Sequence, residues 1–523
     1  MTTGHKDRQQ PGGQRLARWI GVLGVLNAAG FAARAVTSYG LASVAPFGVP
    51  QPREAEVFDA LGRTLRLLGP GIRTFVSGHN VLARREIFLW VYSGPLLLES
   101  AVFVALLILL VRYRGVLEPS MPRRLFRWSL AFVAVSLLAS PVLVQDFWLS
   151  VGWGRMVAAG LNPYHTPLSA AMADRLPVDN DLRMQMTYGP LWALISGAVA
   201  WLGHRSVPLE AALFKVLLAG AWIASLRLVW LLLQRHSLWQ QCTGLVLFGW
   251  MPSSVTESVA EGHNDIVLVC LLLLWLYQIE RGRPFAACLA LAASVLVKYV
   301  TAPLFVLDFL HWRFGRGRRP AGYLPCLFLA GTFVAVTTGV FYRSAEFFSA
   351  TVKMARWRFL APSDAVFLVG DWLGELWGAP WMRAPFLFLG VAVFAVFPLL
   401  AFYGAVSYLR RPGTAKLWEA VLAVMSAVLF CVVGHVWPWF VVWVLAVGAL
   451  VAGSGLTRWV VGVALAAPFA TLILFTFPGH GQYVVPTLVL NGSAALWFVF
   501  APRRWFAPVP LAETGCATAA YDG

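Results

Sequence analysis

The sequence predicts an all-α polytopic membrane protein, and three observations support this fold class. Hydrophobic residues make up 59% of the 523 residues, charged residues only 12%, and the mean hydropathy is +0.70. Apolar runs recur along the chain at the length of about 17–25 residues that a bilayer-spanning helix needs. Because a bilayer offers no water to backbone N–H and C=O groups, such runs fold as helices. We expect a bundle of about 11–14 transmembrane helices with outer-face loops and broken helices.

The net charge of +17 does not indicate a nucleic-acid partner. The basic residues form short clusters beside hydrophobic runs, and this distribution is typical of cytoplasmic loops rather than of a nucleic-acid-binding surface. Five of the six cysteines lie in or beside apolar segments, and the sequence contains no CxxC motif or Cys/His cluster. We therefore expect no disulfide framework, no metal site and no cofactor.

The first part of the chain predicts three spans and the side of the membrane on which the third one ends. Residues 19–41 follow a basic N-terminus and form the first expected span, which we favour over a cleaved signal peptide. Residues 88–112 form the second span and residues 125–144 the third, with a dense basic loop between them. Because basic loops stay in the cytoplasm, the third span delivers Asp146 to the periplasmic or extracellular face.

The later basic clusters are consistent with this orientation under two conditions. Residues 188–202 must not cross the membrane fully, and residues 285–310 must contain two short segments that turn near 298–303, because both flanks of this stretch are basic. Further spans are expected near Phe248, Ile266, Phe328, Phe394, Val428, Val444, Leu465 and Leu490.

Asp146 is the first candidate for chemistry, because an acid at a hydrophobic boundary is costly unless it serves a function. A carboxylate in a partly dry aromatic site has a raised pKa and can take a proton from a hydroxyl. A helix-end charge that faces water is the alternative. Arg155, nine residues later, could pair with Asp146 or hold a phosphate with its guanidinium, or could be a loop-surface arginine.

Aromatic and amide side chains accompany Asp146 in the stretch 145–192. Asn162-Pro163-Tyr164 forms a turn after Gly160, and its tyrosine could stack on a sugar ring. We expect Trp148, Asn162, Tyr164 and Tyr188 to contribute to substrate binding, although the turn taken alone is only a turn and aromatic residues also form interfacial belts.

The segment Glu261-Gly262-His263-Asn264-Asp265 interrupts two apolar stretches with four polar side chains. Its density of His, Asp and Glu could bind a metal, but no second histidine occurs at helical spacing, so metal binding is the weaker interpretation. Hydrogen bonding to a glycan by Glu261, His263, Asn264 and Asp265, or positioning of Asp146, fits the segment better. A structural cluster that ties two helices together is the remaining alternative.

Two further sites combine charge or imidazole with apolar surroundings. Lys298 lies inside an apolar run, where a lysine is expensive and is usually paired. A lipid phosphate would supply its counter-charge, and snorkelling to the interface is the alternative. His435 lies with Trp437 and Trp439 at a span boundary. These residues could cap the headgroup of a lipid-linked donor, or could belong to an aromatic belt.

Six short motifs occur in an order that resembles the GT-C glycosyltransferases. They are an Asp after the first core span, GR…AAGLNPY, YGPLW, ESVAEGHND, LVKYVTAPLFVL and HVWPW. The nearest branch is that of the bacterial polyprenyl-phosphate-mannose-dependent mannosyltransferases, which is similar in pattern to the eukaryotic GPI mannosyltransferases. The resemblance covers residues 122–500 and leaves the first two spans outside it.

The resemblance implies a catalytic first outer loop and the inverting transfer of a hexose, expected to be mannose, from a polyprenyl-phosphate sugar to a glycan or glycolipid acceptor. It carries Asp146 over as the general base, with Lys298 and Arg155 as cations for the departing phosphate. The family often has two consecutive acids here, whereas Gln145 and Phe147 flank Asp146. This departure argues against a metal-bridged acid pair. The family also often has Tyr-Pro-Pro where this chain has Tyr-Gly-Pro at residues 188–190.

Three alternatives remain open, and one of them is a non-catalytic assembly or sensor protein. An arabinofuranosyl or glucosyl donor could use the same scaffold, and no residue separates these sugars from mannose. A transporter or flippase of lipid-linked sugars would often show internal repeats, and the sequence shows no matching pair of halves.

The expected organisation is a two-span module (1–121), a GT-C-like transmembrane catalytic core (122–502) and a disordered cytoplasmic tail (503–523). We expect the protein in the plasma (inner) membrane, with its active site on the periplasmic or extracellular face. Its expected partners are membrane lipids, the polyprenyl-phosphate sugar and the acceptor, and no nucleic acid.

Overall fold

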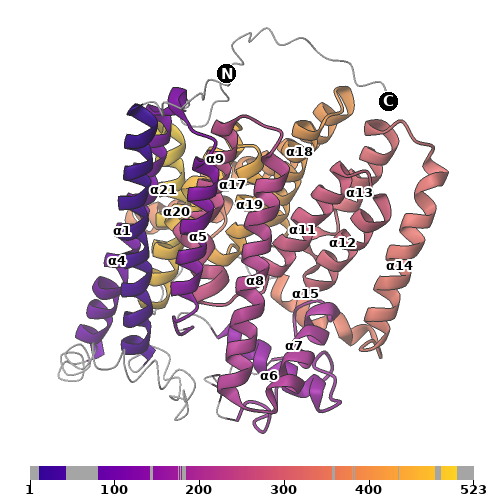
Figure 1. The fold of residues 1–523 in the computed structure, drawn as a ribbon. Helices are drawn as coiled ribbons and strands as arrows, with labels where there is room; N and C mark the ends of the chain where they lie inside the picture. The colour runs from indigo at the N-terminus through magenta and orange to yellow at the C-terminus, as the bar shows by residue number, and fades with distance from the viewer. Residues whose placement is uncertain are drawn as a thin grey trace, which may run out of the picture.

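The computed structural model describes residues 11–42, 81–141, 145–174, 176, 178, 184–355, 360–379, 381, 383–433, 435–476 and 484–502. Every regular element within these ranges is a helix, and most of the long helices run side by side in one bundle (Figure 1). The predicted all-α polytopic class is therefore confirmed. The predicted tail, part of the N-terminal module and part of the loop between Asp146 and Tyr188 lie outside the described residues.

The bundle is built from long helices and from short elements that interrupt or cap them. The longer helices are α1 (Pro11–Ala42), α4 (Val81–Arg112), α5 (Met121–Ser136), α8 (Val207–Leu233), α9 (Leu238–Gly249), α11 (Asp265–Glu280), α12 (Pro284–Val297), α14 (Leu324–Gly339), α16 (Pro362–Leu376), α17 (Arg383–Arg410), α18 (Thr414–Ala427), α19 (Val441–Leu450), α20 (Gly455–Thr476) and α21 (Val484–Phe500). The shorter elements near the candidate site are α6 (Asp146–Ala158), α7 (Pro190–Gly203), α10 (Pro252–Val255), the π-helix η3 (Thr256–Ala260), the 3-10 helix η4 (Tyr299–Thr301), α13 (Leu304–Leu310) and α15 (Ser349–Ala355).

Seven described helices are long and apolar enough to cross a membrane, and a bent helix pair would make an eighth span. Four shorter apolar helices of 10–17 residues accompany them. Two of these, Pro190–Gly203 and Pro284–Val297, lie in stretches that are expected not to cross fully, so the described helices give fewer spans than expected. Large apolar side chains on α14 and α17 face outward, for example Phe328 and Phe388 with exposed fractions of 77% and 75%. Such surfaces are compatible with contact to lipid chains.

The predicted third span differs from the helix that the structure shows. We expected it at residues 125–144, whereas α5 begins at Met121 and ends at Ser136. The helix begins earlier because Pro122 is tolerated in a first helical turn, where its missing N–H has no partner to lose. It ends earlier because the chain turns ahead of Pro141, and a proline disfavours helical backbone in the residue before it.

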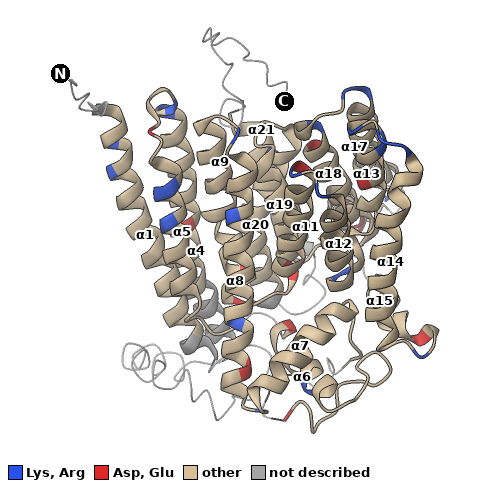
Figure 2. Ribbon diagram, turned by 45° about the vertical axis from the view of Figure 1, so that its right-hand side comes forward, with Lys and Arg blue, Asp and Glu red and all other residues tan. Residues whose placement is uncertain are grey.

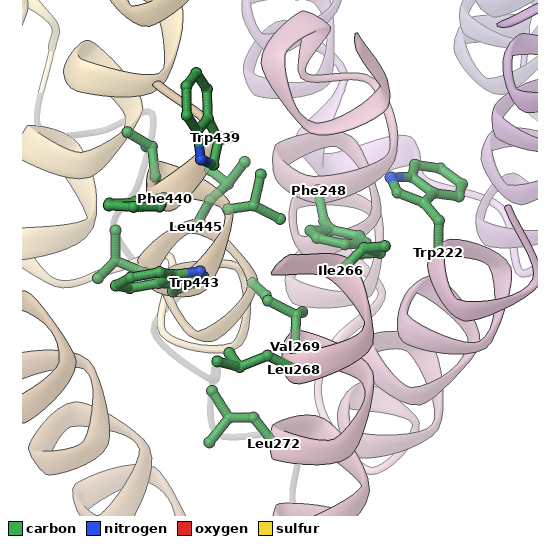
Figure 3. Packing of buried hydrophobic residues seen from close by; sticks show 14 of the residues in the cluster. Trp222, Phe248, Ile266, Leu268, Val269, Leu272, Trp439, Phe440, Trp443 and Leu445 are labelled. Atoms are coloured by element: carbon green, nitrogen blue, oxygen red, sulfur yellow. The ribbon is translucent and has the colours of Figure 1, made fainter. Parts of the chain in front are cut away.

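α11 packs against α12 and α8 and also against α19. Its labelled side chains, including Ile266 and Val269, lie between aromatic residues of other helices, such as Trp443 of α19 and Phe248 of α9 (Figure 3). Trp222 of α8 stacks on Phe248 with ring centroids 5.5 Å apart. This close packing fixes the position of α11, whose first residue is Asp265.

Two helical stretches are broken where the sequence predicts breaks. The pair formed by α10 with η3 and by α11 bends by 116° at residues 261–264. α12 ends at Val297, Lys298 adopts extended backbone with φ −154° and ψ 125°, and the chain turns through η4 into α13. The prediction of two short segments that turn near 298–303 is therefore confirmed. Broken helices at membrane depth are tolerated where they are buried in protein or line a cavity.

α6 and α7 pack against each other at one end of the bundle (Figure 1). α7 has 14 residues and a length of about 21 Å, which is shorter than the hydrocarbon core of about 30 Å. This length agrees with the expectation that residues 188–202 do not cross fully.

The basic clusters gather at the end of the bundle away from α6 and α7, where Figure 2 shows most of the blue ribbon. Contacts between their loops support this arrangement. The Arg114 guanidinium lies 4.9 Å from the ring centre of Trp239, and His311 Nδ1 lies 2.8 Å from the Tyr408 hydroxyl oxygen. The loops that the sequence predicts to be cytoplasmic therefore lie at one end.

Arg155 ties α6 to α8. Its guanidinium contacts Oε2 of Glu210 from Nε at 2.9 Å and from Nη2 at 2.8 Å, and donates to the backbone carbonyl of Asp174 at 2.9 Å. Arg155 and Glu210 are 6% and 0% exposed, so the ion pair is buried. The alternative in which Arg155 pairs with Asp146 is not what the structure shows, because Arg155 lies toward the opposite end of α6. These contacts favour a structural role over the expected contact with a donor phosphate.

Replacing Arg155 alone should destabilise the protein strongly. In Arg155→Met the buried Glu210 carboxylate loses its cation, and we expect the free energy of unfolding to fall by about 3–5 kcal/mol. The double variant Arg155→Met with Glu210→Leu should recover most of that stability, as measured by the thermal unfolding midpoint in detergent. Recovered stability without recovered activity in the double variant would contradict a purely structural role for Arg155.

Candidate active site

Asp146 is the first residue of α6, and its side chain accepts a hydrogen bond from the Tyr188 hydroxyl to Oδ2 at 2.9 Å. The carboxyl group is partly buried. Desolvation raises the pKa of Asp146 to about 6, against the opposing effects of the Tyr188 hydrogen bond and of the positive charge on Lys298. A carboxylate with such a pKa is ionised near neutral pH and is still basic enough to accept a proton.

Lys298 lies next to this pair, at the break between α12 and α13. Its ammonium group donates to Asp265 Oδ1 at 2.8 Å and lies 5.1 Å from the ring centre of Tyr188 and 4.1 Å from that of Phe440. Tyr188 therefore contacts both Asp146 and Lys298. We call Asp146, Tyr188, Lys298 and Asp265 the acid–lysine cluster. Its members come from four separate segments of the chain.

The Glu261–Asp265 segment meets the late HVWPW motif. The His263 ring stacks on Trp439 with centroids 4.2 Å apart and planes 9° apart, and Trp439 stacks in the same way on Trp437 at 4.7 Å. His435 is buried, with its ring 5.7 Å from that of Phe440, which also contacts Lys298. Two motifs that are about 170 residues apart in the sequence thus form one surface beside the acid–lysine cluster.

Four buried polar atoms on this surface make no hydrogen bond to the described residues: Asp265 Oδ2, Asn264 Nδ2, His263 Nε2 and Trp439 Nε1. The great majority of buried polar atoms in proteins have a hydrogen-bonding partner. Four such atoms in neighbouring residues are compatible with a site for a polar ligand or ordered water. Both donors and acceptors are among them, as the hydroxyl groups of a sugar would require.

The aromatic and amide residues of the first outer loop hold the loop together. The Tyr164 hydroxyl donates to the backbone carbonyl of Tyr188 at 2.9 Å, and its ring stacks on Phe347 at 4.3 Å. Asn162 donates to the Phe341 carbonyl at 2.5 Å and accepts from the Tyr164 N–H at 3.1 Å. Tyr164 is 1% exposed, so in this structure its ring packs within the protein instead of offering a face to a sugar.

Trp148 lies two residues after Asp146 in α6. It is 8% exposed and packs edge-on against Phe147, with ring centroids 5.0 Å apart. The expected contribution of Trp148 to substrate binding stays a prediction.

Glycines allow the segments of the site to approach one another. A Cβ on Gly189 would lie 2.1 Å from the backbone oxygen of Leu296, and the Gly189 N–H donates to the Val297 carbonyl at 2.9 Å. Gly262 has φ +78°, and a Cβ there would lie 2.5 Å from the Phe147 ring. The loop that carries Tyr188 and the segment that carries Asp265 are thereby held against Lys298 and Asp146 respectively.

Several charged residues near the site were missed at the level of sequence. Lys215 of α8 donates to the carbonyl oxygens of Val259, at 2.6 Å, and Ala260, and Arg34 of α1 forms an ion pair with Glu99 of α4. Lys215, Arg34 and Glu99 each lie inside an apolar run of the sequence. A charge in such a run is a signal by which these residues could have been identified as candidates for a functional role.

Comparison with known proteins adds the family. Residues 60–315 match the model of a family described as alpha-(1->6)-mannopyranosyltransferase, N-terminal domain. This stretch contains the whole acid–lysine cluster, whereas His435 and Trp437 lie beyond it. A comparison with curated proteins gives no match. The match and the all-helical membrane fold show that this chain is a membrane glycosyltransferase of the GT-C type, in which residues 60–315 are similar to the alpha-(1->6)-mannopyranosyltransferase family.

Proposed function

We propose that this protein transfers a mannosyl group from a polyprenyl-phosphate sugar to a hydroxyl group of a glycan or glycolipid acceptor. The observation that carries the proposal is the acid–lysine cluster, in which a carboxylate with a raised pKa lies beside a buried ammonium group. The description of the matching family supports mannose as the sugar.

Asp146 acts as the general base in this mechanism. The acceptor oxygen attacks the anomeric carbon, the bond from that carbon to the phosphate oxygen breaks, and its electron pair leaves with the phosphate. The acceptor proton goes to Asp146, whose pKa of about 6 suits this transfer. The phosphate is a good leaving group and needs no general acid. One direct displacement inverts a β-mannosyl phosphate to an α-mannoside, which agrees with the linkage in the family description.

Lys298 supplies positive charge for the departing phosphate. An ammonium group has three N–H donors, and the described contacts of Lys298 assign one of them, to Asp265. The surrounding rings of Tyr188, Phe440 and Trp443 exclude water. In such a site a cation aimed at developing negative charge stabilises the transition state more than it would in water. Asp265 holds the ammonium group of Lys298 by a hydrogen bond. Trp443 donates to the same Asp265 oxygen and so limits the motion of the Asp265 side chain.

The sugar binds beside the buried cluster formed by His263, Asn264, Asp265 and Trp439. The four unpaired polar atoms there provide hydrogen bonds to hydroxyl groups. Trp437, which is half-buried, ends the ring stack and offers a face on which a sugar ring can lie. Glu261 and His435 flank this buried cluster and belong to the same proposed site.

The proposed site faces the periplasm or cell exterior, and the protein lies in the plasma (inner) membrane. The support for this orientation is the gathering of the basic loops at the end of the bundle away from α6 and α7. Lys- and Arg-rich loops are retained on the cytoplasmic side.

Asp146→Asn should abolish most of the transfer activity. Loss of a general base lowers the rate by about 10²–10⁴-fold, and the assay is transfer of radiolabelled mannose from polyprenyl-phosphate mannose in membranes that contain equal amounts of each protein. Asp371→Asn is the matched control, because Asp371 is an exposed carboxylate on α16. Equal activity in wild type and Asp146→Asn would remove Asp146 from the mechanism. Activity only with arabinofuranosyl or glucosyl donors would replace mannose and keep the base.

The pH dependence should follow the ionisation of Asp146. Only the ionised carboxylate accepts a proton, so kcat/KM should fall as the pH decreases through about 6. Tyr188→Phe removes a hydrogen bond that lowers this pKa, so the acidic limb should move to higher pH. The measurement is kcat/KM across the pH range for both proteins. An unchanged acidic limb in Tyr188→Phe would separate the observed ionisation from Asp146.

Removing the buried ion pair should separate the folding role of Lys298 from its role toward the donor. Lys298→Gln with Asp265→Asn removes both charges, which avoids an unpaired buried carboxylate. We expect a thermal midpoint close to that of the wild type and a loss of roughly 10²-fold or more in kcat/KM for the lipid donor. Wild-type kcat/KM in this stable double variant would exclude a role for Lys298 in phosphate stabilisation.

A further inference from the structure

α1 and α4 place a buried polar network in the core. Arg34 of α1 forms an ion pair with Glu99 of α4 and donates to the hydroxyl group of Thr256 in η3. The Tyr92 hydroxyl of α4 donates to Glu261 Oε1 at 3.2 Å. Arg34, Glu99 and Tyr92 are each at most 1% exposed. Charges within apolar helices are expensive and are retained where they serve a function, since packing two such helices requires none.

The network contacts one short segment, residues 256–263. This segment contains the π-helix η3 and the turn at Gly262. π-helical turns are rare and are frequently found at functional sites. α8 holds the same segment from another direction, because Lys215 donates to the carbonyl oxygens of Val259 and Ala260. Three helices, α1, α4 and α8, therefore fix a stretch of backbone that is not an ordinary α-helix.

Residues 256–263 also contact residues next to the acid–lysine cluster. Gly262 lies against Phe147, the neighbour of Asp146. His263 stacks on Trp439, and Asp265 at the start of α11 binds Lys298. A shift of residues 256–263 would move the partners of both the base and the lysine.

We propose that Tyr92 and Arg34 are positioning residues, through which the N-terminal helix pair holds residues 256–263 so that Lys298 faces the donor phosphate. This inference rests on the proposed function. Tyr92 and Arg34 contact no reacting group in that mechanism and reach residues 256–263 through Glu261 and Thr256. α1 lies outside residues 60–315, which match the family, and α4 lies inside them. The network therefore joins α1 to the part of the chain that matches the family.

Tyr92→Phe tests the proposal by removing one hydroxyl group. We expect the KM for the polyprenyl-phosphate donor to rise roughly three- to tenfold, as the loss of one buried hydrogen bond implies. A variant that only lowers the fraction of folded enzyme reduces the maximal rate and leaves KM unchanged. The KM therefore separates positioning from a general structural role.

Tyr408→Phe is the matched control. Tyr408 is 0% exposed, and its hydroxyl group lies 2.8 Å from His311 Nδ1 at the opposite end of the bundle. This variant loses a comparable buried contact and should keep the wild-type donor KM.

A second variant tests the contribution of the Arg34–Glu99 ion pair. In Arg34→Met with Glu99→Leu both charges are replaced by apolar side chains, a change that buried ion pairs often tolerate without loss of stability. Because the contact to Thr256 is lost, the donor KM should rise here as well.

Donor KM values equal to the wild type in both Tyr92→Phe and the Arg34/Glu99 double variant would overturn the positioning role. If Asp146→Asn is inactive in the same assay, that result leaves the proposed function intact. Undiminished transfer by Asp146→Asn would instead overturn the proposed function.

Discussion

The ion pair between Lys298 and Asp265 is the interaction on which the rest of the site depends. Each residue lies at a helix break, and the 2.8 Å contact joins the end of α12 to the start of α11 inside an apolar bundle. Neither charge could be buried there without the other, because an unpaired charge in this environment costs several kcal/mol. The pair also fixes the position of an ammonium group beside Tyr188 and, through it, beside Asp146.

Aromatic rings and glycines make this arrangement compact. Phe440, Trp443 and Tyr188 surround the ammonium group of Lys298, while Gly189 and Gly262 let neighbouring backbones approach more closely than any side chain would allow. The result is a dry site in which a carboxylate keeps a raised pKa and a cation remains poorly screened. Both properties favour transfer from a phosphate leaving group, since charge develops where fixed charges already stand.

The buried charged side chains of the helices have different structural roles. The Arg155–Glu210 pair joins α6 to α8, and the Arg34–Glu99 pair joins α1 to α4 and reaches the π-helix. Lys215 satisfies carbonyl groups that the π-helix and the following break leave free of helical partners. A broken backbone at membrane depth therefore requires polar partners from several helices, and these partners fix its shape.

The sequence by itself determined the class of the protein, the places where helices break and the candidate base. Apolar composition forces helices, and a charge such as Asp146 or Lys298 in an apolar run marks a break or a site whatever surrounds it. Only the tertiary structure decided which group each charge meets. Asp265 bonds to Lys298 across 33 residues and to Trp443 across 178, while Arg155 meets Glu210 and Tyr164 is covered by Phe347. Spacing along the chain does not report such contacts, because helix packing brings together residues from distant segments.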